Sequence, residues 1–185
     1  MSVELFNYIS VAVSIILAIS ATHLLSGLRD VIAPQRRDWL VVCWYAYLGY
    51  LHLLLWWSLF AAHNVSRWNF GTFTIAMAVP ASLYLAVYAL MSEAPAAVHS
   101  WKEHFEKVRR WFFLFYGLFI ATSAVRETLL LGRPLLGVGS AFDAITILNV
   151  TAGAIWRNRR IQIAVLSLEL LIALWVSAQR FYAER

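Results

Sequence analysis

The chain has 185 residues, of which 62% are hydrophobic, 15% aromatic and 14% charged. Soluble domains carry about 25% charged residues and about half apolar ones, so this composition is typical of a membrane protein. The net charge of +5 could suggest nucleic-acid binding, but the positive charges lie in short clusters between apolar stretches. We therefore expect the lipid bilayer as a partner, and no nucleic acid.

Six apolar stretches follow one another, each about 20 residues long, which is the length that crosses about 30 Å of hydrocarbon. The first holds Glu4 and has no Lys or Arg before it, so it lacks the positive region of a cleaved signal peptide and is expected to be retained. We predict an all-α, polytopic membrane protein with a single transmembrane domain over residues 1–185. The six transmembrane helices are predicted at residues 4–27, 39–62, 70–91, 109–131, 138–156 and 161–181.

The Lys and Arg residues between the spans predict the orientation, because cytoplasmic loops carry the excess of positive charge. One side receives ten of them: Arg29, Arg36, Arg37, Lys102, Lys107, Arg109, Arg110, Arg157, Arg159 and Arg160. The other side receives five: Arg67, Arg126, Arg133, Arg180 and Arg185. The first side is therefore predicted to be cytoplasmic, with both termini on the non-cytoplasmic side.

The loop between the third and fourth spans, residues 92–110, is the only one long enough to hold structure of its own. Val98, Trp101, Phe105 and Val108 recur in it at helical spacing, with charged residues elsewhere on the helical wheel. A short amphipathic cytoplasmic helix on the membrane surface is one interpretation. A helical extension of the fourth span into the cytoplasm is the other.

Ionisable side chains inside the predicted spans are the candidate functional residues, because a charge at membrane depth is costly and usually has a partner. Arg126, with Glu127 beside it, lies near the outer end of the fourth span, and Asp143 lies near the outer end of the fifth. An antiparallel hairpin would bring Arg126 and Asp143 into an ion pair. Such a pair either pins two helices together or belongs to a gate or polar pathway, unless both groups are simply exposed at the outer interface.

Deeper in the bilayer, Glu169 of the sixth span and Asn149 of the fifth are expected at the same level. Polar and small residues form one stripe on each of these helices: Asp143, Thr146, Asn149 and Gly153, and Gln162, Glu169, Ser177 and Arg180. We interpret the two stripes as a candidate water-accessible seam. Either Glu169 is protonated and hydrogen-bonded to Asn149 in a structural role, or it is a proton or cation site.

His52 lies near the middle of the second span and His23 near the inner end of the first. A b-type haem needs two imidazoles at one level, and these depths do not match, so no cofactor is predicted. Hydrogen-bonded structural roles are expected instead, or in the case of His52 a proton-sensitive one. No metal site is expected either, because His99 and Glu103 alone provide too few ligands.

No Gly-rich phosphate loop, Gly-x-Ser-x-Gly motif or His-Glu-x-x-His motif occurs in the sequence. Enzymatic activity therefore has no positive support, although sites assembled from distant residues would escape such motifs. In the first span, Asn7, Ser10, Ser14, Ala18 and Ala21 form a stripe of small or polar residues. Such a stripe predicts a buried face, used either in internal packing or in dimerisation.

Several apolar motifs spread over most of the chain at residues 6–11, 23–28, 52–57 and 109–113, together with Pro80 and Tyr84. In these motifs the chain resembles an uncharacterised family of small bacterial integral membrane proteins with six helices. The resemblance implies a bacterial inner (plasma) membrane. It brings no known activity, and no functional residue is carried over from it.

The sequence thus favours a channel- or transporter-like protein for a proton or a small cation. Because one copy of 185 residues encloses little volume, a homo-oligomer is expected. The alternative is a non-catalytic accessory or assembly protein that binds lipid or a partner subunit. The residues predicted to form the polar pathway are Glu169, Asn149, Asp143, Arg126 and His52, followed by His23, Glu127 and Gln162.

Overall fold

The computed structural model describes residues 2–61, 65, 68–91 and 94–183, with side chains over 6–59, 65, 68–91 and 94–178. Arg67, Arg185 and the side chain of Arg180, which contribute to the predicted orientation, lie outside this part of the chain. All regular structure in the described residues is helical: α1 (Ser2–Ser26), α2 (Leu28–Val31), α3 (Trp39–Ala61), α4 (Phe70–Leu90), the short 3-10 helix η2 (Pro95–Ala97), α5 (Trp101–Leu131), α6 (Val138–Ile155) and α7 (Arg159–Ala183).

Six of these helices are long and apolar enough to cross a membrane, so the prediction of six spans is confirmed at that level. Five of them match the predicted ranges closely, whereas α5 begins at Trp101, well before the predicted start at residue 109. Large apolar side chains cover the outside of the helices, with Leu53 68% exposed and Leu148 70% exposed. An apolar surface of this extent is typical of a protein embedded in lipid.

The loop that contains the predicted amphipathic helix is resolved into η2 and the beginning of α5. The Ser100 side chain accepts a hydrogen bond from the Glu103 backbone N–H, which caps the first turn of α5. Trp101 and Phe105 are buried in the protein, and the helix continues without a break into the fourth span. Residues 101–108 thus belong to the same continuous helix as the fourth span.

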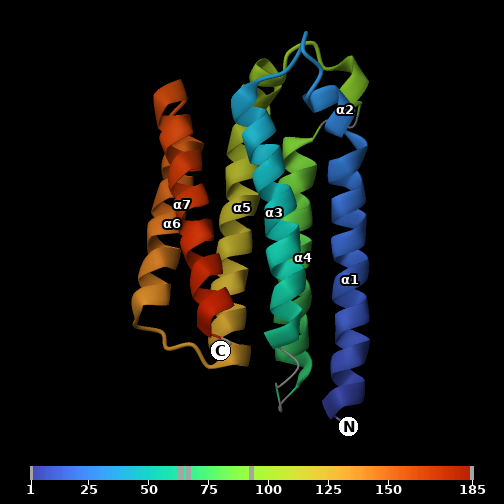
Figure 1. Ribbon diagram of the computed structural model, residues 1–185, viewed down its shortest axis with the longest axis vertical. Helices are drawn as coiled ribbons and strands as arrows, with labels where there is room; N and C mark the ends of the chain where they lie inside the picture. The colour runs from blue at the N-terminus through green and yellow to red at the C-terminus, as the bar shows by residue number, and fades with distance from the viewer. Residues whose placement is uncertain (1, 62–64, 66–67, 92–93, 184–185) are drawn as a thin grey trace.

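The helices run side by side along the long axis, with α1 at one edge, α3 and α4 in the middle, and α5, α6 and α7 at the other edge (Figure 1). The beginning of α1 and the end of α7 lie at the same end of the bundle, which we call the terminus end (Figure 1). Residues 27–38 and 94–100 lie at the opposite end, which we call the loop end (Figure 1). The connection from α5 to α6 returns at the terminus end, where Gly132 ends α5 with a left-handed backbone (φ 66°).

The loop end is closed by a polar network centred on Arg36. Its guanidinium pairs with Asp30 at 2.7 Å and donates to the carbonyl oxygens of Ala96 at 2.6 Å and Val98 at 3.2 Å. The indole N–H of Trp101 donates to the backbone oxygen of Asp30 at 2.9 Å. These bonds tie the segment after α1 to the segment before α5.

The predicted buried stripe of α1 is not the face that the chain buries most fully. Ile9, Val13 and Leu17 are 1–3% exposed, whereas Asn7 and Ala18 are exposed. The larger apolar side chains fill the groove of the bundle better than small ones, so they take the inner face. Ser10, Ser14 and Ala21 are half-buried, so the stripe is buried in part, and both internal packing and dimerisation through it stay predictions.

Candidate intramembrane cavity

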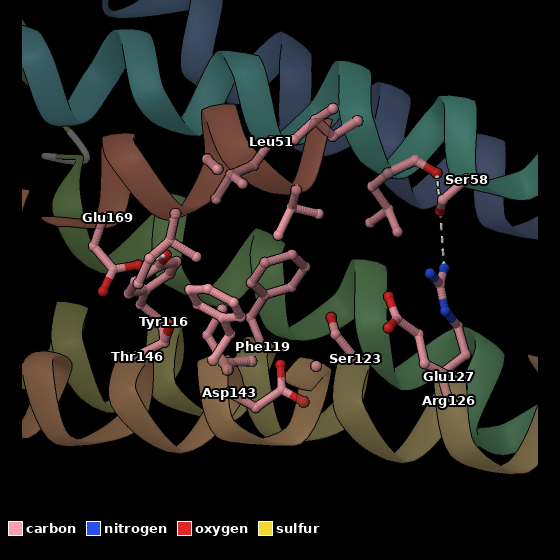
Figure 2. A pocket seen from close by; sticks show the side chains of 18 of the residues that line it. Leu51, Ser58, Tyr116, Phe119, Ser123, Arg126, Glu127, Asp143, Thr146 and Glu169 are labelled. Carbon is pink, nitrogen blue, oxygen red and sulfur yellow. Dashed lines mark hydrogen bonds between the residues drawn. The ribbon is translucent and has the colours of Figure 1, made fainter. Parts of the chain in front are cut away.

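A cavity of about 290 Å³ lies between α3, α5, α6 and α7. This volume corresponds to the share of about ten water molecules in the liquid. Figure 2 shows Glu169 and Tyr116 at one end of the cavity, Arg126 with Ser58 at the other, and Phe119, Ser123 and Asp143 in between. Since Tyr116 and Arg126 both lie on α5, the two ends are separated by roughly 15 Å of helix rise.

The deep end, which we call the floor, is a hydrogen-bonded cluster around Glu169. This carboxyl group is 1% exposed and accepts a hydrogen bond from the Tyr116 hydroxyl at 2.6 Å. Its second oxygen accepts from the Asn149 amide at 2.7 Å, and the hydroxyl groups of Tyr116 and Tyr47 are 2.9 Å apart. Two donors aimed at two carboxyl oxygens form a pattern suited to an ionised carboxylate.

The residues of the floor come from four different helices. Tyr47 belongs to α3, Tyr116 to α5, Asn149 to α6 and Glu169 to α7. The amide of Asn149 also donates to the backbone oxygen of Val165 at 2.9 Å, which fixes α6 against α7. The predicted association of Glu169 with Asn149 is therefore confirmed, with the two tyrosines added to it.

Beyond the floor, toward the loop end, aromatic side chains fill the space between the helices. Trp44 is fully buried and meets the rings of Phe112 and Phe113 edge to face, at centroid distances of 5.0 Å and 5.5 Å. The ring of Phe113 rests on Gly153 so closely that a Cβ built there would lie 2.6 Å from it. We call Trp44, Phe112 and Phe113, together with Gly153, on which Phe113 rests, the aromatic plug.

A buried arginine lies beyond the plug. Arg109 is 2% exposed and donates to the carbonyl oxygens of Ala154 at 2.7 Å and Trp156 at 3.1 Å, and also to that of Gly153. Gln162 donates to the Gly153 and Trp156 oxygens at 2.9 Å and 2.5 Å. The last carbonyl groups of a helix lack partners inside the helix and carry partial negative charge, so both side chains complete the end of α6. Gln162, predicted in the polar pathway, has this capping role and does not line the cavity.

The opposite end of the cavity, which we call the mouth, carries two arginines and two carboxylates. Arg133 pairs with Glu127 at 3.0 Å and also with Asp143. The side chains of these three residues are between 16% and 26% exposed, which marks this end as the one that reaches the surface. Arg126, only 8% exposed, donates to the Ser58 hydroxyl at 3.1 Å.

The mouth thus gathers Arg126, Glu127 and Asp143 as the sequence suggested, but with a partner that it did not suggest. Asp143 pairs with Arg133, and the ion pair of Asp143 with Arg126 stays a prediction. Arg133 lies in the connection after α5, next to Gly132, so its position depends on the turn there. In the sequence, Arg133 was used only as one of the positive charges that predict the orientation. In the structure, it bridges α5 and α6 through Glu127 and Asp143.

The walls between floor and mouth are mainly apolar and partly aromatic. Phe142 and Trp175 stack near the mouth at a centroid distance of 4.3 Å, and Tyr116 and Phe119 stack near the floor at 6.2 Å. The other apolar side chains of the walls are Leu51, Leu54, Leu55, Ile120, Ile172, Ala173 and Val176.

The two histidines of the predicted pathway lie away from the cavity. His52 is 5% exposed, and its ring nitrogens lie 2.7 Å from the Leu48 backbone oxygen and 2.7 Å from the Ser20 hydroxyl, so it joins α3 to α1. His23 packs its ring on Tyr88 and Tyr84 of α4. Neither belongs with Glu169, because the α1–α3 and α1–α4 contacts lie on the other side of the bundle (Figure 1).

Three residues of the site were missed at the sequence level: Tyr47, Tyr116 and Arg133. In a chain with 15% aromatic residues, nothing in the sequence sets these two tyrosines apart. Their role in the site follows only from the structure, which places the Tyr116 hydroxyl beside a carboxyl group of another helix. Within the described residues, no group of three or more His, Cys, Asp or Glu side chains could hold a metal ion.

Comparison of the chain with known protein families, with curated proteins and with solved structures gives no match.

Proposed function

We propose that the protein is a transporter-like multi-pass membrane protein that binds a proton or a small cation at Glu169, in a cavity whose mouth lies at the terminus end. The observation that carries this proposal is the charge of the cavity lining. Three carboxylates, Glu127, Asp143 and Glu169, face two guanidinium groups, Arg126 and Arg133. One negative charge is in excess, and a site of low polarity favours its neutralisation by one proton or one monovalent cation.

The form of the cavity favours a carrier over an open channel. The mouth reaches the surface at the terminus end, whereas the aromatic plug and the capped end of α6 fill the bundle toward the loop end. A bound ion would therefore have access from one side in this state. Release on the other side would need a rearrangement of the plug, as expected for alternating access.

The proposed membrane is the bacterial inner membrane, with both termini outside the cytoplasm, in line with the count of ten positive residues against five and with the family resemblance. In this orientation the cavity faces the non-cytoplasmic side. The first turns of α5 form the amphipathic cytoplasmic segment, in which Lys102, Glu103, Glu106 and Lys107 are exposed. The contact face of the proposed homo-oligomer is the small-residue stripe of α1, in which Asn7 and Ala18 are exposed, and the cavity itself lies within one chain.

Proton flux into proteoliposomes tests the proposal. We expect a potassium gradient with valinomycin to drive acidification of vesicles loaded with a pH-sensitive dye, at a rate above that of empty vesicles. Glu169→Gln should abolish the increase and Asp143→Asn should reduce it, whereas Glu106→Gln, an exposed carboxylate far from the cavity, should leave it unchanged. The proposal fails if neither a proton gradient nor a sodium gradient produces flux, or if flux is the same in Glu169→Gln.

A second function is a non-catalytic accessory protein that binds lipid or a partner subunit. One observation favours it: both oxygens of Glu169 already have donors within the chain, as expected for a group that only joins helices. Under this alternative, Glu169→Gln lowers stability, and the wild-type protein transports nothing. The flux measurement therefore separates the two functions.

A further inference from the structure

The cavity walls bear on which cation the protein would take. A bare metal cation that leaves water needs several oxygen ligands in its place, and Ca²⁺, for example, takes six to eight. Near the floor, the structure offers the carboxyl group of Glu169 and the hydroxyl groups of Tyr47, Tyr116 and Thr146. Between the floor and the mouth, the walls are mainly hydrocarbon and aromatic rings, which cannot replace a hydration shell.

An ammonium ion with apolar substituents fits such walls better than a bare metal cation does. It carries no tightly held hydration shell around its substituents, and burial of these substituents against Leu51, Phe119 and Ile172 is favourable. Its charge is attracted to the faces of aromatic rings within about 6 Å. Four aromatic side chains are available along the path in two stacked pairs, Phe142 with Trp175 and Tyr116 with Phe119.

We propose that the cavity binds an organic monocation, an ammonium ion with aromatic or branched apolar substituents, with the Glu169 carboxylate as its counter-ion. This inference rests on the proposed function and names its substrate class. The volume of about 290 Å³ accepts a compact ion with a single ring and falls at the lower end of the range of small-ligand pockets. The single excess carboxylate sets the charge of the ligand at one.

The same carboxylate makes the cation and the proton mutually exclusive. When Glu169 is protonated, arrival of the cation releases that proton, so one O–H bond breaks, the proton leaves to water and the carboxylate keeps the electron pair. The groups facing Glu169 are Tyr116 and Tyr47 at the floor and Asn149 from α6, while Arg126, Glu127, Arg133 and Asp143 are at the mouth. One cation is thus exchanged for one proton.

Titration calorimetry on the purified protein in nanodiscs tests the inference with benzyltrimethylammonium. Two ligands serve as controls: phenylacetate, an anion with the same ring, and sodium, an inorganic monocation. We expect saturable binding of benzyltrimethylammonium only. Titration in two buffers of different ionisation enthalpy should show release of protons in a range of pH where Glu169 is protonated.

Three variants locate the binding. Glu169→Gln should weaken the affinity tenfold or more, and Glu106→Gln should not change it. Phe142→Leu, which keeps an apolar side chain and removes a ring, should weaken it by about two- to thirtyfold, the range of a single cation–π contact. This variant keeps the test valid if Glu169→Gln does not fold.

The outcomes separate this inference from the proposed function. Proton or sodium flux without binding of benzyltrimethylammonium overturns the inference and leaves the proposed function standing. Binding that depends on Glu169 and Phe142, with no flux even when benzyltrimethylammonium is supplied inside the vesicles as the exchange partner, supports the cation site and overturns the proposed transport. Equal binding of phenylacetate also overturns the inference, since it would show that the ring of the ligand is bound and its charge is not. Binding of benzyltrimethylammonium that is unchanged in both Glu169→Gln and Phe142→Leu overturns it too, since the ion would then bind elsewhere.

Discussion

The two halves of the bundle surround their buried arginines with different kinds of groups. In the loop-end half, Arg109 is enclosed by backbone carbonyl groups at the end of α6. In the terminus-end half, Arg126 contacts a hydroxyl group, and it lines a cavity together with three carboxylates. Fixed carbonyl groups cannot be titrated or displaced, whereas hydroxyl and carboxyl groups can change partner or protonation. The comparison indicates that the first half is built for rigidity and the second for exchange.

Aromatic side chains are also more completely buried in the loop-end half than in the terminus-end half. Trp44 and Phe112 are completely buried among other rings, so the plug is a packed core. Trp175 is 40% exposed and stacks on Phe142 at the cavity, where only part of its surface is covered by protein. Each difference can be measured by replacing corresponding residues in the two halves.

The largest effect is expected for the two buried arginines. Arg109→Met should lower the free energy of unfolding by about 3 kcal/mol, because the end of α6 loses a charged donor and only the Gly153 and Trp156 oxygens keep Gln162. Arg126→Met should cost less than half as much, since the cavity allows water to reach the groups that Arg126 contacts, the Ser58 hydroxyl among them. Unfolding by SDS titration in mixed micelles measures both values.

Methionine is used in both variants because it fills a similar volume without charge. Equal losses in the two variants would contradict the comparison, since they would show that the guanidinium of Arg126 is held as rigidly as that of Arg109. A larger loss for Arg126→Met would reverse it.

A smaller effect is expected for the packing of the plug. Gly153→Ala places a Cβ 2.6 Å from the ring of Phe113, which must shift against Trp44, so we expect a loss of about 1–3 kcal/mol. Gly49→Ala is the matched control within α3, because its Cβ would meet Leu24 at 3.7 Å, an ordinary contact. The same SDS titration applies, and a loss in Gly49→Ala as large as in Gly153→Ala would assign the effect to the helix backbone.

The sequence predicted the helices well because each apolar run is bounded by polar or helix-breaking residues. Asn69, for example, precedes α4 and forms a capping box with Thr72, and Gly132 ends α5. The fourth span was predicted to begin at residue 109, later than α5, because Lys102 and Lys107 interrupt the apolar run although the helix continues through them. Hydropathy locates the part of a helix inside lipid, and says little about how far the helix extends beyond it.

The candidate site was predictable only in part, for a physical reason. Depth along a helix follows from residue number, so Glu169 and Asn149 could be placed at one level. Rotation and neighbour choice depend on packing, which put His52 against Ser20 of α1 and Gln162 at the end of α6. The role of Arg133 was not predicted because this residue lies in a connection between helices, where no periodicity indicates the direction of its side chain.

The smallest effect is expected at the mouth, for the ion pairs of Arg133. Arg133→Gln should lower the free energy of unfolding by about 1 kcal/mol or less, because ion pairs that reach water contribute little and are screened by salt. Arg159→Gln, which removes the 2.9 Å pair with Asp38 at the loop end, is the matched control. SDS titration at low ionic strength and in 1 M sodium chloride should give equal, small losses that shrink with salt. A loss of several kcal/mol that persists in 1 M salt, for Arg133→Gln alone, would mean that the mouth is a fixed structural joint like the end of α6. The proposed division into a rigid half and an exchanging half would then fail at the point where an ion has to enter.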